Sequence, residues 1–243
     1  TPPFTPTLIN RRLYARGAED DKGQVMYSIK AMEALVKAGA LECTVKILIE
    51  GEEESGSQGI SRCLKKWKKM LKADVLMVSD VSMAPDNSPT IIMGLRGVGH
   101  LTVLLRGPNH DLHSGIHGGL APNPAQELAH LLASLHKPDG SIAVKGYCDS
   151  ITPPSILERR QANAVAFSQS LYARKTGVPG IAGEKRFTPQ ERTGFRPSID
   201  INGIHSGSGG KGTKTIIPSQ SFAKLSPRFV PGQDPQKCLD AVK

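Results

Sequence analysis

Three short acidic segments in the first third of the chain carry the residue types from which a metal centre can be built. They are Glu19-Asp20-Asp21, Glu50 with Glu52-Glu53-Glu54, and Asp80. Taken singly, such clusters usually serve loop solubility. Several negative charges gathered at one place are unfavourable unless a cation offsets them. A pair of divalent metal ions would do so, with one carboxylate bridging both ions and a water held between them.

The residues alone do not decide which ion would bind. Zinc usually takes imidazole as well as carboxylate ligands, and residues 1–99 contain no histidine. Carboxylates without imidazole would suit magnesium or manganese about as well. The residue types therefore predict an acidic metal site that lacks part of its ligands.

Helices and strands alternate in the part of the chain that carries these acids. Apolar residues at helical spacing predict helices over Gly23–Ala38 and Ile60–Leu71. Nearly continuous apolar runs predict buried parallel strands over Cys43–Ile49 and Asp74–Val78. Such alternation is typical of an α/β domain with a parallel sheet. Each predicted strand ends just before one acidic segment, and sites in such sheets form where strands end.

The pattern changes near residue 95, where an α+β arrangement begins. A polar, irregular stretch is predicted from residue 147 to about residue 196. Two helices with four antiparallel strands predict an α+β sandwich, which differs from the α/β pattern before it. We therefore expect two domains, residues 1–94 and 95–243. The predicted elements are strands His100–Arg106, Ser141–Gly146 and Ser198–Ile204, strands within Thr215–Val230, helix Pro124–His136, and a helix beginning at Asp234-Pro235.

Composition argues against two classes of partner. The net charge is +9, but the densest basic run, Lys65–Lys69, lies on the polar side of a predicted amphipathic helix and serves as its solvated face. No signature of a nucleic-acid-binding module accompanies it. No apolar run reaches the ~20 residues that span a bilayer. We therefore expect neither a nucleic-acid nor a membrane partner.

The acidic segments and several later ones resemble the dinuclear zinc peptidases and deacylases. That family includes carnosinase, bacterial dipeptidases, glutamate carboxypeptidase, acetylornithine deacetylase and succinyl-diaminopimelate desuccinylase. The resemblance covers essentially the whole chain in the family's order. The segments that carry it are Leu13–Gly23 (LYARGAEDDKG), Glu50–Ser57 (EGEEESGS), Val78-Ser79-Asp80, Asp111–Gly115 (DLHSG), Lys214–Pro218 (KTIIP) and Arg228–Pro235 (RFVPGQDP).

For the acidic segments, the resemblance implies a set of roles around two Zn²⁺ ions, with Mn²⁺ or Co²⁺ as alternatives. Asp20 would bridge the two ions, and the Asp20–Asp21 peptide bond would be cis. Glu54 would bind one ion and Asp80 the other. Glu53 would be the general base that takes a proton from the metal-bridging water and passes it to the leaving amine.

For residues 95–243, the resemblance implies a lid domain that also forms a homodimer. His113 would reach across the dimer interface and polarise the scissile carbonyl of the partner subunit's substrate. Thr215 and Arg228 would hold the substrate's carboxylate end, for which a guanidinium fork has suitable geometry. Pro227 departs from the family pattern, and because proline cannot donate to a ladder it predicts an edge position or a local bulge.

Two histidines that the family uses lie outside this sequence, one in an H-x-D segment upstream and one downstream. If these residues are all that exists, we expect weak metal binding and no turnover, whereas a longer protein should be active. The chain begins at Thr1, and Thr1–Pro6 shows no secretory pattern. Either a leader or a whole segment has been removed or the start was never seen, and cytoplasmic is the default location.

The function predicted from the sequence is zinc-dependent hydrolysis of the amide bond in dipeptides or short peptides. Within the family, aspartate rather than glutamate at the third metal position favours dipeptidases, and Asp80 occupies that position. Two alternatives remain. One is an N-acyl amino acid deacylase of the same family, and the other is a non-catalytic dimerisation or binding fragment.

Overall fold

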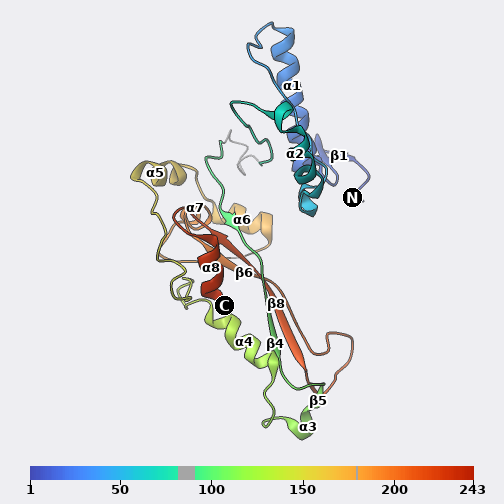
Figure 1. The fold of residues 1–243 in the computed structure, drawn as a ribbon, viewed down its shortest axis with the longest axis vertical. Coiled ribbons are helices and arrows are strands. Elements are labelled where there is room, and N and C mark those ends of the chain that lie inside the picture. Colours follow the sequence, from blue (N-terminus) through green and yellow to red (C-terminus); the bar gives the residue numbers. More distant parts are fainter. Residues whose placement is uncertain (82–90, 179) are drawn as a thin grey trace. The chain divides into compact units, whose positions relative to one another are not determined.

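The computed structural model describes residues 1–81, 91–178 and 180–243 (Figure 1). The chain divides into two compact units, Thr1–Met93 and Gly94–Lys243. Both units combine helices with strands, so the mixed α/β class predicted from the sequence is confirmed.

The first unit is built from two helices and a small hairpin. Strands β1 (Thr7–Ile9) and β2 (Arg12–Tyr14) pair antiparallel. A short segment, η1 (Ala18–Gly23), whose backbone is non-helical at Asp20 and Asp21, leads into α1 (Gln24–Lys37). A short 3₁₀ turn, η2 (Glu53–Ser55), comes before α2 (Gln58–Leu71). Both predicted helices are therefore confirmed, with bounds shifted by one or two residues.

The two parallel strands predicted for this unit are wrong. Residues 43–49 and 74–78 belong to no strand, and most of their apolar side chains are exposed, Ile47 by 60% and Leu76 by 87%. A buried parallel strand needs a hydrogen-bonded neighbour and cover on both faces. Among the described residues nothing pairs with either segment. The apolar composition of these two segments suits a buried strand, but a strand forms only where a neighbouring strand is present to pair with it.

The second unit is organised around one long strand, β8 (Gln220–Phe229). On one side β8 pairs antiparallel with β4 (Leu101–Arg106) and β3 (Gly97–Val98). On the other side it pairs antiparallel with β6 (Ser198–Ser206), and a register shift falls between Ile201 and Gly203. The predicted strands at residues 100–106, 198–204 and 215–230 are thus confirmed.

Pro227 lies inside this central strand, so of the two predicted settings, an edge position or a local bulge, the edge position is wrong. It is fully buried and pairs with Ile199 on the β6 side. On the other side, the amide of Gly99 donates to the Pro227 carbonyl at 2.9 Å, but proline has no N–H to return. The ladder is therefore interrupted at this point, which separates β3 from β4 although both keep the same register with β8.

Two helices cover one face of this sheet and form the core with it (Figure 1). Helix α4 (Pro124–Ser134) begins at Asn123, whose side chain accepts from the Ala125 amide, and α8 (Pro235–Val242) begins at Asp234, which caps it in the same way. These are the two helices that the sequence predicts. The buried core consists of Leu128, Leu132, Leu135, Tyr147, Ile199, Ala223, Leu225, Phe229 and Cys238.

The stretch after α4 differs from its prediction in two ways. The strand predicted over residues 141–146 is reduced to one bridge, between His136 and Ile142. The stretch predicted to be irregular contains three short helices: α5 (Ile156–Ala164), α6 (Gln169–Thr176) and α7 (Pro189–Gly194). Capping boxes at the starts of α5 and α7 stabilise helices too short to show a clear apolar period.

At one end of the long sheet, a small two-stranded ladder carries a further helical turn. Strand β5 (Leu112–His113) pairs with β7 (Ile216–Ile217), and α3 (Ser114–His117) follows directly (Figure 1). The glycine-rich segment 207–212 lies between β6 and β7 as a loop. This end of the unit is called the tip below and comprises residues 111–117 and 215–219.

Candidate functional site

The carboxyl groups of Asp20 and Asp80 lie close together in the first unit. Asp20 sits in η1, where its peptide bond to Asp21 is cis, as the resemblance implied. Although the Asp80 residue is largely exposed, partial desolvation raises the pKa of its carboxyl. The negative charges of Asp20 and Asp21 and a hydrogen bond with Asp20 raise that pKa further.

The glutamates of the η2 turn belong to the same acidic group. The negative charge of Glu54 raises the pKa of Glu53, followed by desolvation and then by the charges of Asp80, Glu50 and Asp20. Glu50 also contributes a buried carboxylate oxygen, Oε1, that has no hydrogen-bond partner among the described residues. The structure therefore gathers Asp20, Glu53, Glu54 and Asp80 into one mutually repelling cluster, called the acidic cluster below.

The negative charge of the acidic cluster suits a bound cation, but the described side chains do not supply enough ligands to hold one. Convergent carboxylates are stabilised by a positive ion, and Glu50, beside the cluster, has a buried carboxylate oxygen without a partner in the described residues. Over residues 1–81, 91–178 and 180–243, however, no three His, Cys, Asp or Glu side chains are arranged to hold one metal ion. The side chains present would supply carboxylate oxygen to a divalent ion and no imidazole.

The tip of the second unit holds His113 next to Thr215. The amide of Ser114 donates to the Thr215 carbonyl at 2.9 Å, and His113 pairs with Ile216 across the β5–β7 ladder. The His113 Nδ1 atom accepts a hydrogen bond from the Gly115 amide at 3.0 Å. Because that nitrogen is an acceptor, a neutral His113 ring carries its proton on Nε2 and can donate it.

Asp111 ties the two strands of the tip together. Its Oδ1 atom accepts from the Ser219 amide at 2.8 Å. Hydrogen bonds from the amide and the hydroxyl of Ser219 hold the pKa of Asp111 below its usual range. The Asp111 carboxylate therefore fixes the loop that leads into His113.

Arg228 lies at the other end of β8 from the tip. From Gln220 to Arg228 the strand takes eight residue steps of about 3.3 Å each, roughly 26 Å in total. Thr215 lies beyond Gln220, and Figure 1 shows β5 and α7 near opposite ends of the sheet. In one chain, Thr215 and Arg228 cannot hold the same carboxylate, whereas one residue from each of two copies could.

A second arginine that the sequence did not single out lies beside Arg228. Arg96 and Arg228 both line a pocket of about 320 Å³, together with Gly94, Leu95, Thr193 and Gly194. Burial lowers the pKa of Arg96, and the positive charge of Arg228 lowers it further, while Asp200 opposes that effect. The signal in the sequence, a lone arginine between glycine-rich neighbours, was too weak to find it.

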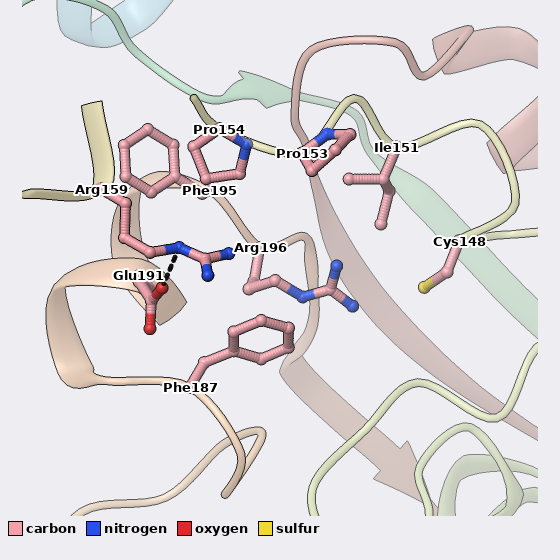
Figure 2. Close-up of a pocket in the computed structure, with 9 residues that line it drawn as sticks. All are labelled: Cys148, Ile151, Pro153, Pro154, Arg159, Phe187, Glu191, Phe195 and Arg196. Carbon is pink, nitrogen blue, oxygen red and sulfur yellow. Dashed lines mark ion pairs between the residues drawn. The ribbon is translucent and has the colours of Figure 1, made fainter. Parts of the chain in front are cut away.

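Another pocket, of about 290 Å³, lies between α5, α7 and the chain before α5 (Figure 2). Its walls are mostly proline, isoleucine and phenylalanine side chains. Arg159 and Arg196 also line it, but Arg159 pairs with Glu191 at 2.8 Å and Arg196 pairs with Glu184 at 2.6 Å. None of the residues predicted to act in chemistry lies in this pocket, and both of its arginines are neutralised.

Comparison with known proteins supports the family resemblance. Residues 96–243 match the M20 peptidase dimerisation domain. The whole chain is 32% identical to the Cys-Gly metallodipeptidase dug1 of Schizosaccharomyces pombe, over 52% of that protein. Over 95% of its length the chain is 31% identical to the human β-Ala-His dipeptidase, of which it covers 46%. The chain thus spans about half the length of the curated relatives it matches.

Solved structures give the same picture. The fold matches an M20 family metallo-carboxypeptidase, Sso-CP2 from Sulfolobus solfataricus, with a TM-score of 0.85 and 31% identity. The alignment covers 99% of this chain and 55% of that one. Within the described residues, no helix has the length and apolar character needed to span a bilayer.

Proposed function

Because this chain belongs to the M20 metallopeptidase family, we propose that it serves in the zinc-dependent hydrolysis of the amide bond of dipeptides or short peptides. The observation that carries the proposal is the acidic cluster. Three separate segments bring the carboxylates of Asp20, Glu53, Glu54 and Asp80 together, so that neighbouring negative charge raises the pKa of Glu53 and of Asp80, and a bound cation would offset this repulsion.

In this proposal, Asp20, Glu54 and Asp80 hold two zinc ions, and Glu53 moves protons. When bound, the ions lower the pKa of a water and polarise the scissile carbonyl. The Glu53 carboxylate accepts a proton from the attacking water and delivers it to the leaving amine.

In this proposal the protein forms a homodimer through residues 95–243. The substrate is bound by His113, Thr215 and Arg228. The Nε2–H of His113 donates to the carbonyl oxygen, because its Nδ1 is already engaged by the Gly115 amide. Since Thr215 and Arg228 lie at opposite ends of the sheet, we assign Arg228 of one copy and Thr215 with His113 of the other to the same dipeptide.

A dipeptide is favoured over an acylated amino acid for two reasons. Asp80 stands at the third metal position, where dipeptidases of the family have aspartate. The curated relatives compared above are named for Cys-Gly and β-Ala-His dipeptides. A deacylase would instead hydrolyse acetylated or succinylated amino acids, so a substrate panel separates the two activities.

The test uses the complete gene product that contains these residues. We expect about two zinc ions per chain and hydrolysis of Cys-Gly or β-Ala-His but not of N-acetyl or N-succinyl amino acids. Glu53→Gln should lower kcat by about 10²–10⁴-fold, with the zinc content unchanged. Glu33→Gln is the matched control, because Glu33 is an exposed carboxylate on α1 that pairs only with Lys30 and Lys37 in the described residues. Full activity in Glu53→Gln would refute the proposal.

The second candidate is a non-catalytic dimerisation module. Two findings favour it: the match to a dimerisation domain, and the lack of a three-ligand group among the described residues. Sedimentation and metal analysis separate the two candidates. A metal-free protein that forms dimers and hydrolyses none of the peptides would support the module.

A further inference from the structure

The cavity between α5 and α7 (Figure 2) has no part in the function proposed above. It shares no residue with the acidic cluster, with the tip, or with the pocket that Arg96 and Arg228 line. Its volume of about 290 Å³ is close to the lower end of small-molecule sites, about 300 Å³, and an apolar cavity of roughly 150 Å³ already holds benzene. The space is therefore sufficient for a ligand with a single ring.

Polar contacts fix the two sides of this cavity relative to each other. Arg159 of α5 pairs with Glu191 of α7 at 2.8 Å. The hydroxyl of Thr188, at the start of α7, donates to the side-chain oxygen of Asn163, near the end of α5, at 2.6 Å. Capping boxes hold the first turns of both helices. Because these contacts set the spacing between α5 and α7, the cavity is a fixed part of the fold.

Flat side chains form much of the cavity wall. Phe187 and Phe195 flank α7, and Pro153 and Pro154 come from the chain before α5 (Figure 2). The guanidinium of Arg196 lies 4.5 Å from the centre of the Phe187 ring and also lines the cavity. Phenyl rings and guanidinium planes both attract a further aromatic ring. The wall therefore favours a planar ligand.

The charges on this wall are already compensated. Arg159 pairs with Glu191, and Arg196 makes two hydrogen bonds to Glu184, at 2.6 and 3.0 Å. Burial raises the pKa of the Cys148 thiol, although the positive charge of Arg196 opposes this effect, so the thiol is uncharged at pH 7. A charged ligand would lose its hydration here without meeting a free counter-charge. The wall therefore favours an uncharged ligand.

We propose that this cavity is a binding site for a small uncharged aromatic molecule, whose ring contacts Phe187, Phe195 and Arg196. The rings of the wall select an aromatic over a saturated ligand, and the ion pairs select a neutral over a charged one. The site is independent of the peptide hydrolysis proposed above, because it holds none of the residues assigned to that reaction.

The test uses Cys148, which lines the cavity, as the reporter of occupancy. The complete gene product is alkylated with iodoacetamide at pH 8 in rising concentrations of benzyl alcohol, of its saturated analogue cyclohexylmethanol, or of benzoate. Peptide mass spectrometry gives the rate at Cys148. Benzyl alcohol should slow this alkylation and should bind about fivefold or more tightly than either other probe. Alkylation of Cys43, which is exposed in the first unit, should not change.

Two variants and a matched control place the effect in the cavity. Ile151→Trp fills the space and should abolish the response of Cys148 to benzyl alcohol. Phe195→Leu keeps an apolar side chain but removes one ring of the wall, so the preference for benzyl alcohol over cyclohexylmethanol should fall. Phe167→Leu is the control, because the Phe167 ring packs on Tyr172 outside the cavity and its loss should leave the preference unchanged.

Glu191→Gln tests the role of charge. The Glu191 Oε2 atom accepts a hydrogen bond from the Thr188 amide at 2.9 Å, and glutamine also completes a capping box, so α7 should remain folded. Arg159 then has no carboxylate on the cavity wall to pair with. Benzoate should bind about fivefold or more tightly to this variant than to the parent, while the affinity for benzyl alcohol should stay the same.

Circular dichroism controls the folding of each variant. If Ile151→Trp fails to fold, Phe195→Leu and Glu191→Gln carry the test. Alkylation of Cys148 that benzyl alcohol does not slow, or slows equally in folded Ile151→Trp, would overturn the site. Cyclohexylmethanol binding as tightly as benzyl alcohol would overturn the aromatic ligand, and benzoate binding as tightly to the parent would overturn the uncharged one.

Discussion

Glu184 offers a direct measurement of how burial changes the strength of an ion pair, because one carboxylate binds two arginines in different surroundings. The Arg196 side chain is 14% exposed and makes two hydrogen bonds to Glu184, Nε to Oε2 at 2.6 Å and Nη2 to Oε1 at 3.0 Å. The Arg186 side chain is 69% exposed and contacts only Oε1. Both guanidinium groups lie over the Phe187 ring, Arg196 at 4.5 Å and Arg186 at 4.9 Å from its centre, so the ring contact does not distinguish them.

The two pairs should therefore differ several-fold in their effect on the free energy of unfolding. Glu184→Gln removes the only carboxylate that Arg196 pairs with in the described residues and leaves a buried charge, which costs about 3–5 kcal/mol. Arg186→Gln breaks a pair that water already screens, and should cost about 0–1 kcal/mol. A domain is stable by about 5–15 kcal/mol, so the Glu184 variant should fold but unfold at much lower denaturant.

The assay is urea unfolding of Glu184→Gln, Arg196→Gln, Arg186→Gln and the two double variants, followed by far-UV circular dichroism. The only tryptophan of the chain, Trp67, belongs to residues 1–93, so its fluorescence reports that unit separately. Coupling between Glu184 and Arg196 should exceed coupling between Glu184 and Arg186. Equal coupling in the two cycles, or less than about 1 kcal/mol in both, would refute the reasoning from burial.

Three further predictions concern stability and thiol reactivity. The buried hydroxyl of Tyr147 has no hydrogen-bond partner in the described residues, so Tyr147→Phe should be neutral or gain about 1 kcal/mol, while Tyr147→Ala should lose about 3–5 kcal/mol, both measured by urea unfolding. The pKa of Asp111 is lowered in the folded state, so its carboxylate stabilises the folded protein above about pH 4. This stabilisation is lost as the pH falls through the folded-state pKa. Asp111→Asn should therefore be less stable than the parent at pH 7, and the difference should shrink below about pH 4. Burial raises the pKa of the Cys148 thiol, which leaves less reactive thiolate, so iodoacetamide at pH 8 should label exposed Cys43 before Cys148, as read by peptide mass spectrometry.

Local signals account for the elements that the sequence predicted well. Helices α1, α2 and α4 show a helical apolar period, and α8 begins at an Asp-Pro pair that caps it. Non-local requirements account for the failures. Residues 43–49 have a suitable strand composition but no partner in the described residues. Helices α5 and α7 are too short for a clear period, and their signal lies in Ser155 with Glu158 and in Thr188 with Glu191.

The candidate site shows the same division. Asp20, Glu54 and Asp80 lie in separate segments, and neighbouring charge from these segments raises the pKa of Glu53 and of Asp80; the roles of these residues stay predictions. The sequence could not show that Thr215 lies beyond the Gln220 end of β8 while Arg228 lies near its other end, since a motif records order along the chain and not distance in space. Arg96 was missed for the same reason, because its importance depends on a neighbour, Arg228, that only the folded sheet supplies.

The central place of β8 has a consequence for how the protein is made. Leu101 pairs with Leu225, and Ile201 pairs with Leu225 from the other side, so both outer strands depend on residues near the end of this sequence. While the ribosome is still translating these residues, β4 and β6 have nothing to join and their apolar side chains stay in water. Topologies of this kind fold slowly, and nascent chains halted before Gln220 should be substrates for chaperones.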